Sequence, residues 1–356
     1  MKRFVFSLLV LLFSVAGASA QLKFVDAEQL GLVNKLGPTK NRYHRVDTDK
    51  YDLTQTEANL LRMPAGMALV FRTNSSQIVV RTHYLNYSMV RYSTTGVSQT
   101  GYDLYIRKDG EWMYAGSNAP KNEDAELVLV RNMDDSEKEC LLYLPLFSEL
   151  KRIEIGIDEG AEIEASANPF RHRIVIFGSS FTHGTSTGRP GMSYPMIMQR
   201  NTGLQFISLG VSGNSKLQQS FAAIIGDSAC DAIVVDAFSN PGPEMIRERF
   251  LPFVAAIRKA HPAVPLIFLQ TIYRERANFD LKERAREEEK RRAAREVFEE
   301  AAEIYNDIYF VDEPDLTGTD HITSLDGTHP DDLGYWRWAN AIQPRIVKIL
   351  KKYGIR

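Results

Sequence analysis

Residues 171–184 read RHRIVIFGSSFTHG, a run of apolar residues that ends in a turn of small ones. A continuous apolar run of this length is typical of a strand buried on both faces. Four similar runs follow, and longer segments with a helical pattern separate them. The five runs lie at residues 174–177, 206–209, 232–235, 266–269 and 308–311. This alternation predicts an α/β region with a five-stranded parallel sheet covered by helices on both faces.

The helices of this region are expected between the strands and after the last one. They are expected near residues 195–200, 216–225, 244–260, 282–305 and 333–351. The stretch 274–300 is the most highly charged, but its acidic and basic residues are mixed and apolar residues recur along it. A solvated amphipathic helix explains this pattern better than a site for a polyanion.

The first half of the chain has a different pattern, with short strands and turns. Residues 68–72 and 78–81 flank a polar turn and suggest a hairpin, and residues 103–107 and 112–114 suggest a second hairpin around Asp109-Gly110. Many short strands without intervening helices predict a jelly-roll-like β-sandwich. A small-residue stretch at 165–169 suggests a boundary between a β-sandwich domain at 21–165 and the α/β domain at 171–356.

Residues 1–20 have the order of a secretory signal: two basic residues, an apolar run at 4–17 and Ala18-Ser19-Ala20. We expect cleavage after Ala20 and export to the periplasm or beyond. The alternative is a retained membrane anchor, but fourteen apolar residues are fewer than the roughly 20 needed to span a bilayer. The mature protein is expected to be soluble, without a stable membrane span.

Composition narrows the choice of partners and cofactors. The 356 residues include 43 Lys and Arg against 45 Asp and Glu, which argues against nucleic acid as the main partner. Cys140 and Cys230 lie in different predicted domains, so free thiols are more plausible than a disulfide. Histidine and cysteine show no spacing typical of metal ligands, and we expect neither a metal site nor a cofactor.

The predicted strand ends carry the candidate catalytic residues, because ligands of open α/β sheets bind at the carboxyl ends of the strands. Ser179 and Ser180 follow the first run, and either could instead cap a helix. Gly213 follows the second run and Asn240 the third, where they could donate to an oxyanion or simply shape loops. Asp326 and His329 lie three residues apart, so one short loop can hold both.

Serine needs a base to become a good nucleophile, and a carboxylate can fix the tautomer of that base. A serine of the first turn, His329 and Asp326 therefore form a candidate catalytic triad. His183 is a rival base near Ser180, but it has no carboxylate at comparable spacing.

In these residues the chain resembles the SGNH, or GDSL-type, hydrolases. The four sequence blocks of that family appear in order over residues 171–350, and Gly101-Tyr102-Asp103-Leu104-Tyr105 resembles the Gly-x-Asp-Leu-Tyr signature of a β domain in one bacterial branch. The resemblance implies a flavodoxin-like hydrolase domain with Ser180 as nucleophile, His329 as base and Asp326 as its orienting partner. It also implies an oxyanion hole made by the N–H groups of Ser180 and Gly213 and the side chain of Asn240.

Two positions depart from the pattern of the family: Ser179 replaces the usual Asp, and Pro241 follows Asn240 where many members have Asp. Such positions usually support loops, so these departures are expected to affect loop anchoring and substrate range rather than the reaction itself.

The expected function is that of an exported serine esterase that removes O-acyl groups, most plausibly acetyl groups, from carbohydrates. A lipase or broad small-ester hydrolase is one alternative, and a glycan-binding protein with an idle hydrolase fold is another. Trp336 and Trp338 could stack on a sugar, although packing is the commoner role of such residues. The sequence leaves the oligomeric state open.

Overall fold

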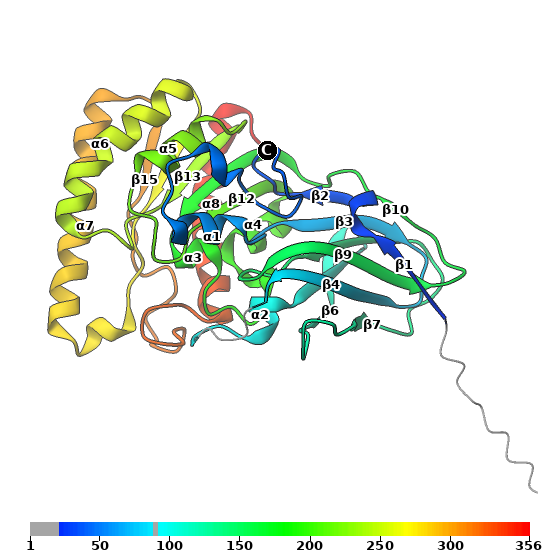
Figure 1. Ribbon diagram of the computed structural model, residues 1–356. Helices are drawn as coiled ribbons and strands as arrows, with labels where there is room; N and C mark the ends of the chain where they lie inside the picture. Colours follow the sequence, from blue (N-terminus) through cyan, green and yellow to red (C-terminus); the bar gives the residue numbers. More distant parts are fainter. Residues whose placement is uncertain (1–20, 88–91) are drawn as a thin grey trace, which may run out of the picture.

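A computed structural model describes residues 21–87 and 92–356, and the predicted signal segment lies outside these residues. In the described part, two antiparallel sheets occupy one end of the molecule and a parallel sheet with its helices occupies the other (Figure 1). None of the helices in this part is long and apolar enough to cross a bilayer.

The antiparallel sheets face each other across a shared apolar core that includes Phe71, Ile78, Leu142 and Ile155. One sheet has the order β1 (Leu22–Asp26), β9 (Glu149–Asp158), β4 (Ile78–Asn86) and β7 (Leu127–Val130). The other has the order β10 (Ile163–Ala165), β3 (Ala68–Thr73), β8 (Lys138–Tyr143), β5 (Tyr102–Lys108) and β6 (Glu111–Asn118), with β2 (Gly31–Val33) paired to β3. The predicted sandwich is therefore confirmed.

One of the two predicted hairpins is correct. Strands β5 and β6 pair around Asp109 and Gly110, whose φ angles of 53° and 86° suit a tight hairpin turn. The prediction that β3 and β4 form a hairpin is wrong, because the two strands lie in different sheets. The Asp158 carboxylate accepts the Ser76 N–H at 2.7 Å and so holds the crossover in place. A local pattern predicts strands but does not choose their partners.

The parallel sheet contains all five predicted strands. Its order is β12 (Leu204–Gly210), β11 (Arg171–Gly178), β13 (Ala232–Asp236), β14 (Leu266–Leu269) and β15 (Ile308–Val311). The helices are α3 (Ser180–His183), α4 (Tyr194–Thr202), α5 (Gln219–Gly226), α6 (Pro243–Ala260), α7 (Leu281–Ile304) and α8 (Asp332–Leu350). Side chains of α5, α6 and α7 cover one face of the sheet, and those of α4 and α8 cover the other.

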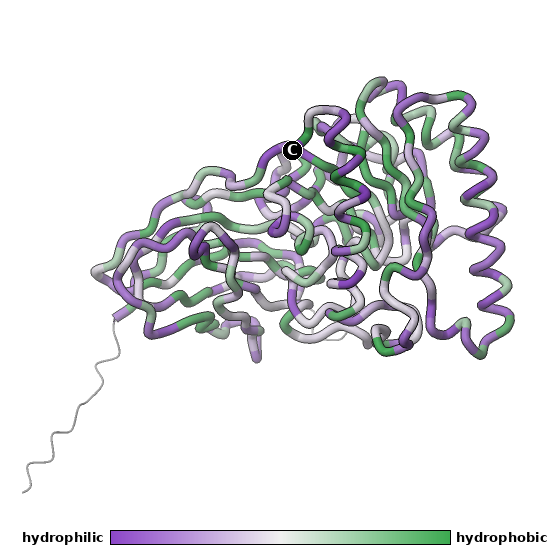
Figure 2. The backbone as a smooth tube through the Cα atoms, turned by 180° about the vertical axis from the view of Figure 1, so that it is seen from behind, coloured by the Kyte–Doolittle hydropathy of each residue, from purple (hydrophilic) through white to green (hydrophobic). Residues whose placement is uncertain are grey.

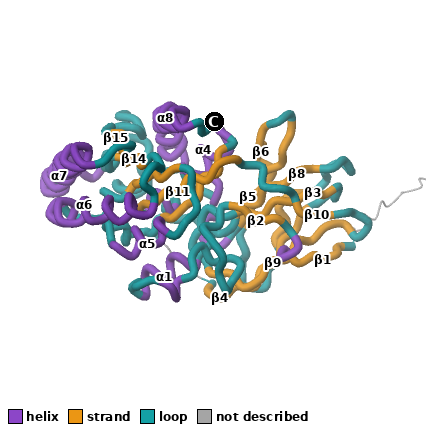
Figure 3. Tube along the Cα trace, turned by 90° about the horizontal axis from the view of Figure 1, so that it is seen from above, coloured by secondary structure: helices purple, strands orange, loops and turns teal. Residues whose placement is uncertain are grey.

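Helix α7, which contains most of the highly charged segment, directs most of its polar residues toward solvent. Helices α6 and α7 lie side by side beyond the sheet (Figure 3), and the hydropathy colouring shows a largely hydrophilic outer helix against apolar interior strands (Figure 2). The amphipathic interpretation of this charged segment is correct for α7 as a whole, since Ala293, Ala294 and Val297 are buried. It is wrong for Glu287 and Lys290, which are buried as well.

A segment from the first half of the chain completes the core of the α/β region. Leu60 and Leu61 of α1 (Gln55–Arg62) belong to the same buried cluster as Val175 and Phe177 of β11. The fully buried Arg45 donates to the carbonyl oxygens of Ser208 and Gly210, and its burial lowers its pKa to about 9. The antiparallel and parallel regions are thus joined through apolar and polar contacts.

Candidate active site

The turn after β11 separates the roles of the two adjacent serines. Ser179 caps α3, with its Oγ accepting the N–H of Phe181 at 3.2 Å. Gly178 is required at this tight turn, because a Cβ there would lie 2.0 Å from Thr182 Oγ1 and 2.9 Å from the carbonyl oxygen of Asp236. The Ser179 hydroxyl is therefore engaged in capping the helix, whereas the Ser180 hydroxyl can bind another partner.

That partner is His329. Ser180 Oγ lies 2.9 Å from His329 Nε2, and His329 Nδ1 lies 2.8 Å from Asp326 Oδ2. The Asp326 carboxylate accepts a hydrogen bond from a protonated Nδ1, so Nε2 is the nitrogen that can take the serine proton. Ser180 is 7% exposed, which leaves its hydroxyl near the surface without full solvation. The structure thus brings these three predicted residues into one hydrogen-bonded chain.

The loop that carries Asp326 and His329 is fixed by its own hydrogen bonds. The backbone N–H groups of Thr328 and His329 donate to Asp326 Oδ1 at 2.9 and 2.8 Å. Burial raises the pKa of Asp326, but these hydrogen bonds and the interaction with the His329 side chain outweigh burial and leave the pKa below its usual value. Asp326 is consequently an ionised acceptor for the imidazole at neutral pH.

The two other predicted residues lie in the loops that follow neighbouring strands. Gly178 pairs with Gly210 and with Asp236 across the parallel sheet, so the loops after β11, β12 and β13 begin side by side. Gly213 adopts a left-handed φ of 75°, and a Cβ placed there would meet no heavy atom within 4 Å. Its glycine is explained by backbone conformation rather than by close packing.

Asn240 is oriented by Ser215. Its Oδ1 accepts the backbone N–H of Ser215 at 3.2 Å and the Ser215 hydroxyl at 3.0 Å. Because a backbone N–H can only donate, the Asn240 atom that faces it must be the oxygen. The NH₂ group is therefore on the opposite side of the amide, available as a donor.

His183 lies apart from this constellation. Its Nε2 donates to the carbonyl oxygen of Leu146 at 2.7 Å, and its ring stacks on Phe147 with centroids 4.3 Å apart. A nitrogen that donates to a carbonyl cannot at the same time act as a base through that atom. The structure does not bring His183 to the Ser180 hydroxyl.

The Gly-x-Asp-Leu-Tyr motif has a structural role that the sequence did not reveal. Arg189 Nη1, in the segment between α3 and α4, contacts both carboxylate oxygens of Asp103 at 2.9 and 2.8 Å, and the Gly191 N–H donates to the same carboxylate at 2.9 Å. Asp103 is fully buried, and that burial raises its pKa although two nearby arginines oppose the shift. The sequence signal for this role was the position of Asp103, an acidic residue among the apolar residues of β5.

Trp338 is buried and stacks on Tyr194 at 4.5 Å, so the packing interpretation is correct for it, whereas Trp336 is 52% exposed. Cys140 and Cys230 are free thiols. Within residues 21–87 and 92–356, no group of three His, Cys, Asp or Glu residues is arranged to hold a metal ion.

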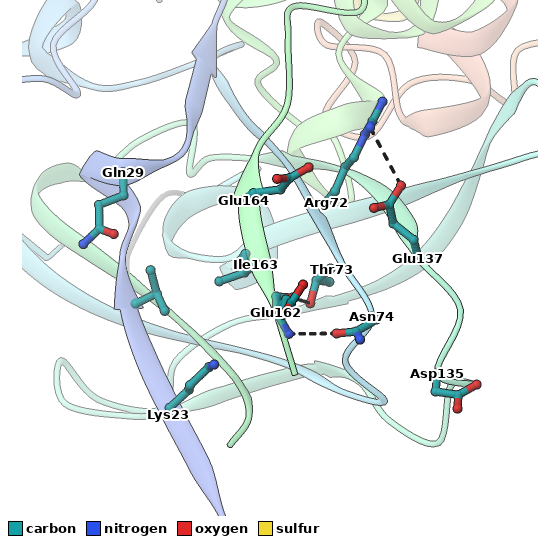
Figure 4. Close-up of a pocket in the computed structure, with 11 residues that line it drawn as sticks. Lys23, Gln29, Arg72, Thr73, Asn74, Asp135, Glu137, Glu162, Ile163 and Glu164 are labelled. Carbon is teal, nitrogen blue, oxygen red and sulfur yellow. Dashed lines mark hydrogen bonds and ion pairs between the residues drawn. The ribbon is translucent and has the colours of Figure 1, made fainter. Parts of the chain in front are cut away.

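A cavity of about 600 Å³ lies on the antiparallel region rather than at the triad (Figure 4). It is lined by charged residues such as Lys23, Arg72 and Glu164, without an aromatic ring that could stack on a sugar. The cavity reaches Thr73, the last residue of β3. Ala68, the first residue of β3, packs in the apolar cluster that is shared with the α/β region, so the cavity lies at the far end of this strand. The cavity is separate from the constellation around Ser180.

Comparison with known proteins agrees with this geometry. Residues 171–347 match the GDSL-like lipase/acylhydrolase family, and residues 22–163 match the N-terminus of SGNH-hydrolase-type esterases. A Bacteroides ovatus ATCC 8483 protein named as a GDSL-like lipase is 41% identical, with a TM-score of 0.91 over 93% of this chain and 98% of that chain. The chain belongs to the GDSL-like lipase/acylhydrolase family. It is an ester-hydrolysing enzyme.

More distant structures share the fold of this GDSL-like hydrolase. A salicylyl-acyltransferase from a tetracycline biosynthetic pathway is 20% identical, with a TM-score of 0.72 over 94% of this chain and 99% of that chain. A family two carbohydrate esterase from Clostridium thermocellum in complex with cellohexaose is 12% identical, with a TM-score of 0.59 over 81% and 93%. No curated protein matches the chain significantly.

Proposed function

We propose that this hydrolase is an exported serine esterase that removes O-acetyl groups from carbohydrates through an acyl-enzyme on Ser180. The observation that carries the proposal is the chain of hydrogen bonds from Ser180 through His329 to Asp326. The signal-like segment at residues 1–20 supports export to the periplasm or beyond, where polysaccharides are available.

The proposed reaction begins when Ser180 Oγ attacks the ester carbonyl and passes its proton to His329 Nε2. Asp326 stabilises the imidazolium that forms, since its Oδ2 accepts a hydrogen bond from the Nδ1–H group. Collapse of the tetrahedral intermediate breaks the bond to the alcohol, which takes the proton from His329. Water, deprotonated by the same imidazole, then hydrolyses the acyl-enzyme and restores Ser180.

The negative oxygen of the tetrahedral intermediate requires donors that are fixed in advance. We assign this role to the N–H groups of Ser180 and Gly213 and to the NH₂ group of Asn240. Support comes from the adjacent origins of the three loops and from the contacts with Ser215 that orient the amide. Loss of one such donor typically costs about 10²- to 10³-fold in kcat.

Polar residues around the site favour a carbohydrate substrate. The partly exposed Asn214 follows Gly213, and the half-exposed Trp336 lies on α8, which begins shortly after the Asp326–His329 loop, so that a sugar ring could stack on it. Structures with the same fold include carbohydrate esterases, which supports this choice only by analogy.

A lipase-like preference for longer acyl chains is the second candidate. Large apolar side chains are exposed on the segments beside the Asp326–His329 loop, with Leu325 at 56%, Ile322 at 59% and Phe279 at 94% exposure. Exposed apolar side chains grouped in this way can receive an acyl chain. The glycan-binding alternative is disfavoured because the hydrogen-bonded triad geometry is complete.

Substrate choice is tested by incubating the enzyme with acetylated xylan, acetylated glucose and 4-nitrophenyl esters of two, four and eight carbons. Acetate and nitrophenol are measured in parallel, with Ser180→Ala as the matched control. The proposal predicts acetate release from the glycans and a kcat/KM that falls as the acyl chain lengthens. A kcat/KM that rises with chain length favours the lipase, and glycan binding without release favours the idle fold.

A further inference from the structure

Three charged side chains are buried behind the loop that carries Asn240. Glu287 and Lys290 lie on α7, and Arg274 lies between β14 and α7. Their side chains are 2%, 0% and 10% exposed, respectively. Most charged residues of α7 face solvent, so these residues differ from the rest of the helix.

The two cations converge on one residue, Ser239. Lys290 Nζ donates to the Ser239 carbonyl oxygen at 2.8 Å, and Arg274 Nη2 donates to the same oxygen at 3.0 Å and to the Ser239 hydroxyl at 2.8 Å. Glu287 lies between the cations, with contacts of 2.5 Å to Lys290 Nζ and 3.3 Å to Arg274 Nε. The cluster thus fixes the residue that directly precedes Asn240.

Global stability is a poor explanation for this arrangement. Burying charged groups carries a desolvation cost that can exceed the attraction between them, so a buried ionic cluster is weak evidence of stabilisation. Its contacts are concentrated on one loop residue instead. Ser239 is held by the cluster and the Asn240 amide is held by Ser215, so both ends of this short unit are fixed.

The same segment also reaches the loop of the acid and base. Arg276 lies two residues after Arg274, and its backbone N–H donates to the carbonyl oxygen of Gly327 at 2.9 Å. The Arg276 side chain also contacts this loop, since its Nη2 lies 3.4 Å from the carbonyl oxygen of Asp326. The segment 274–276 therefore links the Asn240 loop to the Asp326–His329 loop.

We propose that Arg274, backed by the buried Glu287–Lys290 pair, is a positioning residue that holds Asn240 where it can donate to the oxyanion. This inference rests on the proposed esterase function. It extends that function to residues of α7 and of the segment before it, which touch neither substrate nor triad. A displacement near 1 Å of a catalytic group can cost about 10²-fold in rate, so the effect is measurable in kcat.

The first test measures ester hydrolysis by Arg274→Gln and by Arg292→Gln, a control that removes a cation of α7 whose side chain is 67% exposed. We expect kcat to fall roughly 10- to 100-fold in Arg274→Gln with little change in KM, and to stay at the wild-type value in the control. In an Asn240→Ala background, Arg274→Gln should cost less than about twofold more, because the donor that it positions is already absent. If the loss of kcat in the double variant equals the product of the losses in Asn240→Ala and Arg274→Gln, the two residues act independently and the proposal is overturned.

The second test does not depend on activity. Hydrogen exchange of a peptide covering residues 237–242 should be faster in Arg274→Gln than in wild type and Arg292→Gln, with exchange in the antiparallel strands unchanged. If Arg274→Gln does not fold, Ser239→Ala removes only the hydroxyl contact and should give smaller changes in the same directions. Wild-type exchange together with wild-type kcat would refute the positioning role. A wild-type enzyme that hydrolyses no ester would refute the proposed function, while exchange would still decide the question of positioning.

Discussion

The parallel and antiparallel sheets of this protein distribute their polar residues in opposite ways. In the parallel sheet all carboxyl ends meet at one edge, and the loops after β11, β12 and β13 bring Ser180, Gly213 and Asn240 to that edge. In the antiparallel sheets neighbouring strands end at opposite edges, and charged residues pair across an exposed face, as Arg81 does with Glu126 at 2.6 Å. Strand direction therefore concentrates chemistry in one region and disperses it in the other.

The largest effect is expected when the two regions are separated. A protein that begins at Pro169 lacks Leu60 and Leu61 from the core of the α/β region and Arg45 from its contacts with β12. It also lacks the Asp103 carboxylate that binds Arg189. We expect it to aggregate and to lose hydrolysis of both a small aryl acetate and an acetylated polysaccharide, as measured by sedimentation and by acetate release.

Two other outcomes of this truncation are informative. Activity retained on the aryl acetate and lost only on the polymer would indicate that the antiparallel region binds substrate rather than completing the core. A soluble protein equally active on both would contradict any supporting role for that region.

Within the parallel region, the adjacent serines give the next largest contrast. Ser180→Ala should lower kcat by roughly three to six orders of magnitude, because it removes the proposed nucleophile. Ser179→Ala removes only the helix cap at Phe181 and should retain most activity. The reverse order of losses in steady-state kinetics would show that the assignment is incorrect.

The sequence predicted most of what depends on local pattern. All five parallel strands and the five longer helices of the α/β region lie where apolar runs and helical periodicity place them, and the spacing of Asp326 and His329 fits one short loop. It did not predict which strands of the sandwich pair. The local pattern of β3 and β4 is that of a hairpin, but the two strands lie in different sheets on either side of the shared core.

The sequence also missed contacts that depend on burial. Glu287 and Lys290 look like ordinary surface charges within a mixed charged run, but the structure buries both and places Lys290 Nζ on the Ser239 carbonyl oxygen. Asp103 is similar, since its partner Arg189 is 86 residues away along the chain.

Asp103→Asn tests the polar contact between the two regions. Removing the charge leaves Arg189 partly buried without its carboxylate, and breaking such a pair typically costs about 3–5 kcal/mol. The free energy of unfolding in urea should fall by that order, with a smaller loss of kcat. Glu126→Gln breaks an exposed pair in the antiparallel region and should change stability by less than about 1 kcal/mol. Equal losses in the two variants would remove the distinction between these contacts.

The smallest expected effect concerns Asp236, the last residue of β13. Complete burial raises its pKa from 3.8 to about 7, although Thr182 and Tyr194 donate to its Oδ2 and oppose the shift. Between these two values the folded state keeps a proton that the unfolded state releases, so its contribution to stability decreases as pH rises through this window. Asp236→Asn should therefore raise Tm relative to wild type more at pH 8 than at pH 5. The same difference in Tm at both pH values would contradict the raised pKa.

The proposed mechanism requires that the hydrogen-bonded chain at the edge of the parallel sheet make Ser180 a nucleophile. This role of Ser180 can be measured by reacting the intact protein with a fluorophosphonate and locating the adduct by peptide mass mapping. We predict one adduct, on Ser180, whose formation slows strongly in His329→Ala and is unaffected in Arg292→Gln. An adduct on Ser179, or labelling of Ser180 at the same rate without His329, would show that His329 does not activate Ser180 as the nucleophile.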